Sequence, residues 1–135
     1  MDGRFPRAVA FSAVFFAVTG CQIGVVVKVS GSATAPLFEI AEQGWGAKVP
    51  PVFGDFTVAQ QDGGQWSTAW AFSRPQGGCE QATSRVVYGG VPATFVAEQP
   101  VHTLEEGKIY RAMVGGCGRT GAVSFRVING RVVPT

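Results

Sequence analysis

Short segments in which apolar and polar side chains alternate recur along the chain from Val25 onward. Val25, Val27 and Val29 alternate with neighbours that include Lys28, and the segment 37–42 repeats the pattern. A period of two residues is typical of a β-strand with one buried face. The same reasoning predicts further strands at 85–88, 93–98, 110–114, 122–128 and 131–133.

Turn residues between these segments indicate hairpins. Gln61-Asp62-Gly63-Gly64 separates Phe56 and Val58 from a segment that contains Trp66, Trp70 and Phe72. An Asp-Gly-Gly turn between two alternating segments predicts a hairpin, and the three aromatic side chains are expected to fill the core. The 19 glycines and 8 prolines also favour strands and turns over helices. We therefore expect an all-β fold.

The first 20 residues form a separate segment. Arg4 and Arg7 precede an apolar stretch from Ala8 to Val18, and the small residues Thr19 and Gly20 follow it. This order of parts is typical of a signal peptide. The apolar stretch is well short of the roughly 20 residues that cross a bilayer as a helix, which argues against a permanent transmembrane anchor. The rest of the chain, about 115 residues, is long enough for one domain, expected at 21–135.

The residues Val18-Thr19-Gly20-Cys21 resemble the lipobox of bacterial lipoproteins, although Val18 stands where Leu is usual. The resemblance implies cleavage before Cys21 and attachment of lipid to that cysteine. Gln22, unlike Asp at this position, implies transfer to the outer membrane in a host that has two membranes, on its periplasmic face. The alternative is ordinary cleavage near Gly20, which would release a soluble secreted protein.

The chain has three cysteines, and an odd number in an exported protein requires an explanation. If Cys21 carries lipid, Cys79 and Cys117 remain as a pair in an oxidising compartment, where disulfides persist. A metal site is the competing use, but His102 is the only histidine and no Cys-x-x-Cys occurs. We therefore expect a Cys79–Cys117 disulfide, no metal and no cofactor.

The segment from Leu104 to Tyr110 resembles the turn that enters the penultimate strand of fibronectin type III and other immunoglobulin-like domains. The resemblance implies an antiparallel, immunoglobulin-like β-sandwich. It also implies that Leu104 plugs one end of the sandwich and that Gly107 takes a positive backbone angle. The hydroxyl of Tyr110 would hydrogen-bond backward to the connecting chain, as in a tyrosine corner.

One apparent motif has a different explanation. The segment Gly116-Cys117-Gly118-Arg119-Thr120-Gly121 matches G-x-G-x-x-G, which in a dinucleotide site precedes a helix. Here the alternation at 122–128 predicts a strand instead. We expect a hairpin tip that lets Cys117 reach Cys79 and displays Arg119 at the surface as a candidate ligand-binding residue.

Trp45 is the second candidate ligand-binding residue. It lies between Gly44 and Gly46 in an expected loop, where an exposed ring would stack on a sugar or enter a partner's pocket. The alternative is that Trp45 folds back and caps an open end of the sandwich.

The composition and the scarcity of catalytic groups narrow the function classes. The formal net charge is +2 and the basic residues are scattered singly, which argues against nucleic-acid binding. The adjacent Glu105 and Glu106 are expected to point apart into water, and His102 has no nearby nucleophile in the sequence. We predict a non-catalytic binding or structural role at the membrane, with an envelope protein or a glycan as candidate partner. A secreted inhibitor or adhesion module, or a small envelope hydrolase, are the alternatives.

Overall fold

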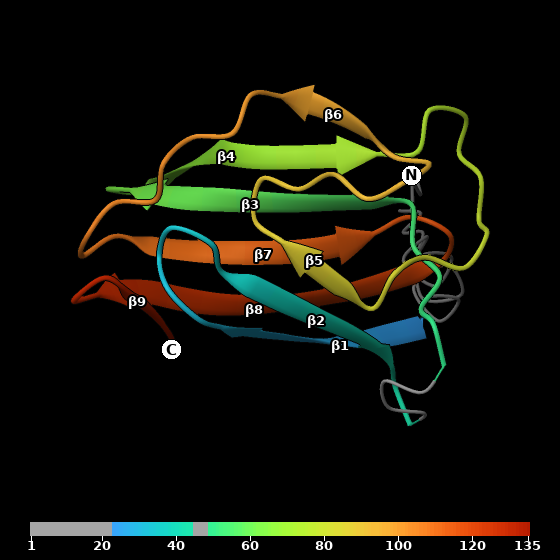
Figure 1. The fold of residues 1–135 in the computed structure, drawn as a ribbon, viewed down its shortest axis with the longest axis horizontal. Coiled ribbons are helices and arrows are strands. Elements are labelled where there is room, and N and C mark those ends of the chain that lie inside the picture. Colours follow the sequence, from blue (N-terminus) through green and yellow to red (C-terminus); the bar gives the residue numbers. More distant parts are fainter. Residues whose placement is uncertain (1–22, 45–48) are drawn as a thin grey trace, which may run out of the picture.

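The computed structural model describes residues 23–44 and 49–135, and these form nine strands and no helix (Figure 1). The expected all-β class is confirmed. The strands are β1 (Ile23–Ser30), β2 (Leu37–Glu42), β3 (Asp55–Asp62), β4 (Gln65–Ser73), β5 (Arg85–Val87), β6 (Val96–Gln99), β7 (Ile109–Gly115), β8 (Arg119–Ile128) and β9 (Arg131–Pro134).

The strands form one curled sheet in the order β5-β2-β1-β8-β7-β3-β4-β6, and β9 pairs with β8. Figure 1 shows β2 crossing in front of β8, and β5 crossing in front of β7. The ring of Phe38 on β2 lies 5.8 Å from that of Phe125 on β8 and 5.1 Å from that of Phe56 on β3. The curl therefore brings the two ends of the strand order face to face, an arrangement compatible with a β-sandwich.

The expectation of a purely antiparallel sheet is wrong at one pair. Strand β1 runs parallel to β8, with Ile23 opposite Arg119 and Gly24 opposite Thr120. The contact is short because the far half of β8 pairs with β9, which returns antiparallel from the tight turn at Asn129 and Gly130. The sheet is therefore mixed. Alternation in the sequence indicates which side chains share a face, but it does not indicate which strands become neighbours.

Alternating side chains of opposing strands fill the space inside the curl. Val25, Val27 and Val29 of β1 are buried, as their pattern predicts. The centre is aromatic, and the largest fully buried side chains include Trp70, Tyr110, Phe38, Phe53, Phe56, Phe72 and Phe125. Aromatic rings bury large apolar areas and pair edge to face or offset, so this cluster supplies much of the stabilisation of the domain.

The hydroxyl of Tyr110 joins three segments at one end of the sheet. It accepts a hydrogen bond from the backbone N–H of Glu105 at 2.7 Å and donates one to Oε1 of Gln60 at 2.9 Å. The expected backward bond is therefore present, Leu104 is buried, and Gly107 has a φ of 82°. Burial raises the pKa of the Tyr110 hydroxyl, so it stays protonated and remains a donor at neutral pH.

Replacing Tyr110 with Phe removes both hydrogen bonds while keeping the ring. Because the Glu105 N–H loses its partner, we expect the free energy of unfolding to fall by roughly 1–3 kcal/mol, measured by chemical denaturation. Tyr110→Ala serves as the comparison, since it also removes the ring and should cost more. A neutral Tyr110→Phe beside a severe Tyr110→Ala would show that Tyr110 acts only as a core residue.

Candidate functional site

Trp66 lies on the outer face of the sheet, and the prediction that it fills the core is wrong. Its exposed fraction is 41%, against 1% for Trp70. The register between β3 and β4 pairs Val58 with Trp70 but Ala59 with Thr68, which leaves Ala69 as an extra residue. Such a β-bulge re-aims the side chains beyond it, so Trp66 points away from the face that Trp70 occupies.

The ring of Trp66 pairs with a cation on the same outer face. The guanidinium of Arg111 on β7 lies over the ring at 4.9 Å from its centre. Strand β3 separates the two residues, and Ala59, directly opposite Arg111, is small enough to let the long side chains meet above it. Within the described residues, Arg111 forms no ion pair with a carboxylate. We call Trp66, Arg111 and the exposed Thr68 beside them the Trp66 shelf.

The Trp66 shelf is fixed by a polar network at the neighbouring turn. Asp62 accepts hydrogen bonds from Gln60 at 2.9 Å, Ser67 at 3.1 Å and Lys108 at 3.2 Å. The bond from Gln60, followed by that from Lys108, lowers the pKa of the Asp62 carboxyl. Gln60 also binds the Tyr110 hydroxyl, so the turn before Trp66 is tied to the strand that carries Arg111. These hydrogen bonds therefore hold the turn that lies beside the shelf.

The exposure of Trp66 predicts a small effect on stability when it is truncated. We expect Trp66→Ala to lower the free energy of unfolding by about 1 kcal/mol, the value of an exposed cation–π pair. Trp70→Ala is the matched control and should cost roughly 3–5 kcal/mol, because it empties a filled core site. Chemical denaturation of both variants measures the difference. Equal losses would place Trp66 in the core after all.

Arg119 is not displayed freely at the surface, which corrects its predicted placement. Its side chain is 21% exposed, and its Nε donates to Oε1 of Glu42 at 2.9 Å. Glu42 is 8% exposed and also accepts from the backbone N–H of Val52 at 2.8 Å. Glu42 lies on the inward face of β2, so a cation must neutralise it, and Arg119 does so. The sequence shows no signal for this pairing, because the two residues are far apart in the chain.

The disulfide joins Cys79 to Cys117, as the cysteine count predicts, with 5.8 Å between the Cα atoms. It connects the loop after β4 to the tip of the β7–β8 hairpin. The Sγ atom of Cys117 also lies 3.4 Å from the carbonyl oxygen of Gly78. Cross-linking across 38 residues restricts the unfolded chain, which the entropy model values at about 4 kcal/mol.

The three glycines of the apparent dinucleotide motif have structural explanations. A Cβ at Gly116 would lie 2.8 Å from the Cα of Gly54, and Gly118 has a φ of 71°. At Gly121 a Cβ would lie 2.6 Å from Cγ2 of Val25. Strand β8 begins at Arg119 where a nucleotide site needs a helix, so the hairpin-tip interpretation is confirmed.

Adding one methyl group at Gly121 tests this close approach. We expect Gly121→Ala to lower the free energy of unfolding by about 1–3 kcal/mol, because β8 must move away from β1. Gly64→Ala is the control: a Cβ there meets nothing within 4 Å, and a change of less than about 0.5 kcal/mol is expected. Thermal unfolding followed by circular dichroism compares the two. A tolerated Gly121→Ala would contradict the assigned contact between β1 and β8.

Two of the predicted residues fall in parts of the chain without a structural description. Trp45, and Cys21 with the rest of the lipobox, lie outside the described residues. Their roles as ligand-binding residue and lipidation site stay predictions. No helix of the described part is long and apolar enough to span a membrane.

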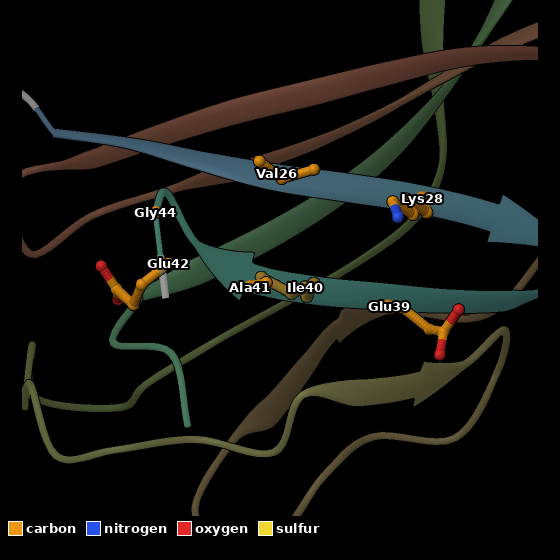
Figure 2. A pocket seen from close by; sticks show the side chains of 7 residues that line it. All are labelled: Val26, Lys28, Glu39, Ile40, Ala41, Glu42 and Gly44. Carbon is orange, nitrogen blue, oxygen red and sulfur yellow. The ribbon is translucent and has the colours of Figure 1, made fainter. Parts of the chain in front are cut away.

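A groove of about 300 Å³ follows the outer side of β1 and β2 (Figure 2). It lies between Val26 and Lys28 of β1 and the segment of β2 from Glu39 to Glu42, and it ends at Gly44. Figure 2 shows Glu39 and Glu42 at opposite ends of the groove, pointing away from each other. The groove therefore brings no set of polar groups together around one point.

Glu105 and Glu106, the adjacent carboxylates in the sequence, lie in different surroundings. Glu106 does not simply face water: its carboxylate accepts hydrogen bonds from the backbone N–H groups of Asn129 and Gly130, and so caps the turn between β8 and β9. Glu105 is exposed, and its backbone N–H binds Tyr110. The part of the chain that the structure describes contains no group of three or more His, Cys, Asp or Glu suited to a metal ion.

His102 contributes its backbone to the fold. Its N–H donates to the carbonyl of Ala69 at 2.9 Å, and its carbonyl accepts from the hydroxyl of Tyr88 at 2.6 Å. Burial raises the pKa of Tyr88, which keeps this donor protonated. These bonds hold the connection before β7 against the bulge in β4, so they help to set the position of Trp66.

Comparisons of this chain with protein-family models, with curated proteins and with solved structures found no match.

Proposed function

We propose that this chain is a lipid-anchored protein of a bacterial cell envelope whose domain binds a partner through the Trp66 shelf and catalyses no reaction. The observation that carries the proposal is the exposed Trp66 under the guanidinium of Arg111. Tryptophan and arginine are the residues that most often dominate binding energy at interfaces. An envelope protein or a glycan is the proposed partner.

The start of β1 supports an anchor close to the domain. The strand begins at Ile23, so only Gln22 separates it from Cys21. At about 3.3–3.6 Å per extended residue, two residues span roughly 7 Å. A lipid on Cys21 would therefore hold the domain against the membrane, on the side where β1 begins.

The Trp66 shelf lies at the opposite end of the domain from this anchor. Ile23 pairs with Arg119, beside the hairpin tip, and Gly115 at that tip pairs with Asp55, the first residue of β3. Trp66 pairs with Gln61, six residues further along β3, which is about 20 Å. The shelf would face away from the membrane, where a partner can reach it.

We also propose that the domain is immunoglobulin-like. The strand order and the Tyr110 hydroxyl bond support this assignment. In such domains ligands are commonly bound by exposed sheet faces or end loops rather than by enclosed cavities. This agrees with a shelf on an open sheet.

The anchor is tested by the mass of the mature N-terminus. We expect protein purified from membranes to begin at Cys21 and to carry the mass of a diacylglyceryl group. Cys21→Ser should abolish both the processing and the lipid. An unmodified mature chain that begins near Gly20 would instead support a soluble secreted protein.

The binding role is tested by a photo-crosslinking residue placed at Thr68 in cells. We expect a discrete crosslinked species from the envelope that is lost in Trp66→Ala and Arg111→Ala. Val26→Ala is the matched control, because Val26 is 43% exposed on the outer side of β1, a strand distant from β4 in the sheet order. A crosslinked species that survives Trp66→Ala, or that Val26→Ala removes equally, would refute binding at the shelf.

A further inference from the structure

Arg74 carries a buried guanidinium at the end of β4, far along the sheet from the Trp66 shelf. Its side chain is 3% exposed. Its Nε donates to the carbonyl of Phe53 at 3.0 Å, and its charged group lies 4.5 Å from the centre of the Phe95 ring. A cation so deeply buried requires an anionic partner, because a charge without one is costly in the protein interior.

The anionic partner of Arg74 is Glu80, whose side chain is largely exposed to solvent. The Oε1 atom of Glu80 lies 3.0 Å from NH1 of Arg74, but the side chain of Glu80 is 79% exposed. A second bond, from Arg74 to the carbonyl oxygen of Glu80, holds the main chain and does not involve the carboxylate. The backbone is therefore fixed without the carboxylate, which remains free to leave.

A hollow of about 550 Å³ opens at this position. Besides Arg74 and Glu80 it is lined by Pro75, Gln76, Gly78, Gln81 and Thr94. A Cβ at Gly78 would lie 2.8 Å from Oε1 of Glu80, so glycine at this position leaves room for a carboxylate beside Arg74. We call this space the Arg74 hollow.

Thr94 provides an independent indication. It has a φ of 72°, which is unusual for a β-branched residue, and its hydroxyl accepts from NH1 of Arg74 at 3.4 Å. Such backbone strain is concentrated at binding sites, where the surrounding structure holds a residue in an unfavourable conformation. The strained backbone of Thr94 keeps its hydroxyl next to NH1 of Arg74, the nitrogen that binds the carboxylate of Glu80.

We propose that the Arg74 hollow binds a carboxylate of an external ligand, which replaces the carboxylate of Glu80. Glu80 marks the position and the chemistry of the ligand group, since its Oε1 atom accepts a charge-assisted hydrogen bond from NH1 of Arg74. The exchange keeps a carboxylate beside the buried guanidinium, while the exposed side chain of Glu80 returns to water. Gln76, Gln81 and Thr94 would then hydrogen-bond the polar groups next to the ligand carboxylate. This site depends neither on the lipid anchor nor on the Trp66 shelf.

The test uses the full chain in detergent micelles and two carboxylates, N-acetylglycine and glucuronate. N-acetylglycinamide and glucose are the matched neutral compounds. The readout is the NMR signal of the Arg74 NH1 protons, the ones that meet the carboxylate of Glu80, and it requires no substitution of Arg74. We expect this signal to shift with either carboxylate and not with the neutral compounds.

Removing the internal competitor should strengthen binding. We expect Glu80→Ala to raise the affinity for the carboxylate by at least about twofold, because the ligand no longer competes with the carboxylate of Glu80. Glu105→Ala is the control at another exposed glutamate and should leave the affinity unchanged. The Cys79–Cys117 disulfide and the Arg74 bond to the Glu80 carbonyl remain in Glu80→Ala, so the loop should keep its shape.

The outcomes separate the sources of the carboxylate. A response to N-acetylglycine alone supports a peptide terminus, and a response to glucuronate alone supports an acidic sugar. No response of the Arg74 signal in Glu80→Ala, equal responses to the neutral compounds, or an affinity that does not depend on Glu80 would each overturn the proposal. Loss of crosslinking at Thr68 or of the lipid at Cys21 has no bearing on these results.

Discussion

The close approach of β8 to β1 at Gly121 is the constraint on which the rest of the structure depends. Only a residue without a Cβ lets the two strands meet there, and this contact carries the sheet from β8 to β1 and on to β2. The turn of the sheet at this point brings Phe38 against Phe56 and Phe125. The aromatic core therefore needs a small residue in a strand where an apolar side chain would otherwise be favoured.

Buried charges fix the end of the domain at which β1 begins. Glu42 and Arg119 connect β2 to β8, while Arg74 binds the carbonyl of Phe53 just before β3. The Cys79–Cys117 disulfide joins the two loops that lie between these contacts. Each buried ion would be costly alone, but here the ions are paired and hydrogen-bonded to irregular segments. This end therefore combines buried charges with the stacked rings of Phe53 and Phe95.

The sequence predicts the features that depend on neighbours in the chain. Alternating valines locate β1, the Asp62-Gly63-Gly64 turn locates a hairpin, and the spacing from Leu104 to Tyr110 predicts the hydroxyl bond. Features that depend on an extra residue or a distant partner are missed. The bulge at Ala69 reverses the direction of Trp66 without changing the alternation. Arg119 is likewise drawn inward by Glu42, which lies 77 residues earlier in the chain.

The two surfaces that we propose for binding differ in whether a group of the protein already occupies them. Hydrogen bonds among Asp62, Gln60 and Tyr110 hold the turn beside the Trp66 shelf. A ligand that binds there would therefore cause little loss of conformational entropy in the protein. The Arg74 hollow already contains a carboxylate, so a ligand there must exchange with Glu80. A shelf favours broad contact with a large partner, whereas an occupied hollow selects by charge. If both proposals hold, the single domain would bind a large partner at one end and a carboxylate near the other, without any moving strand.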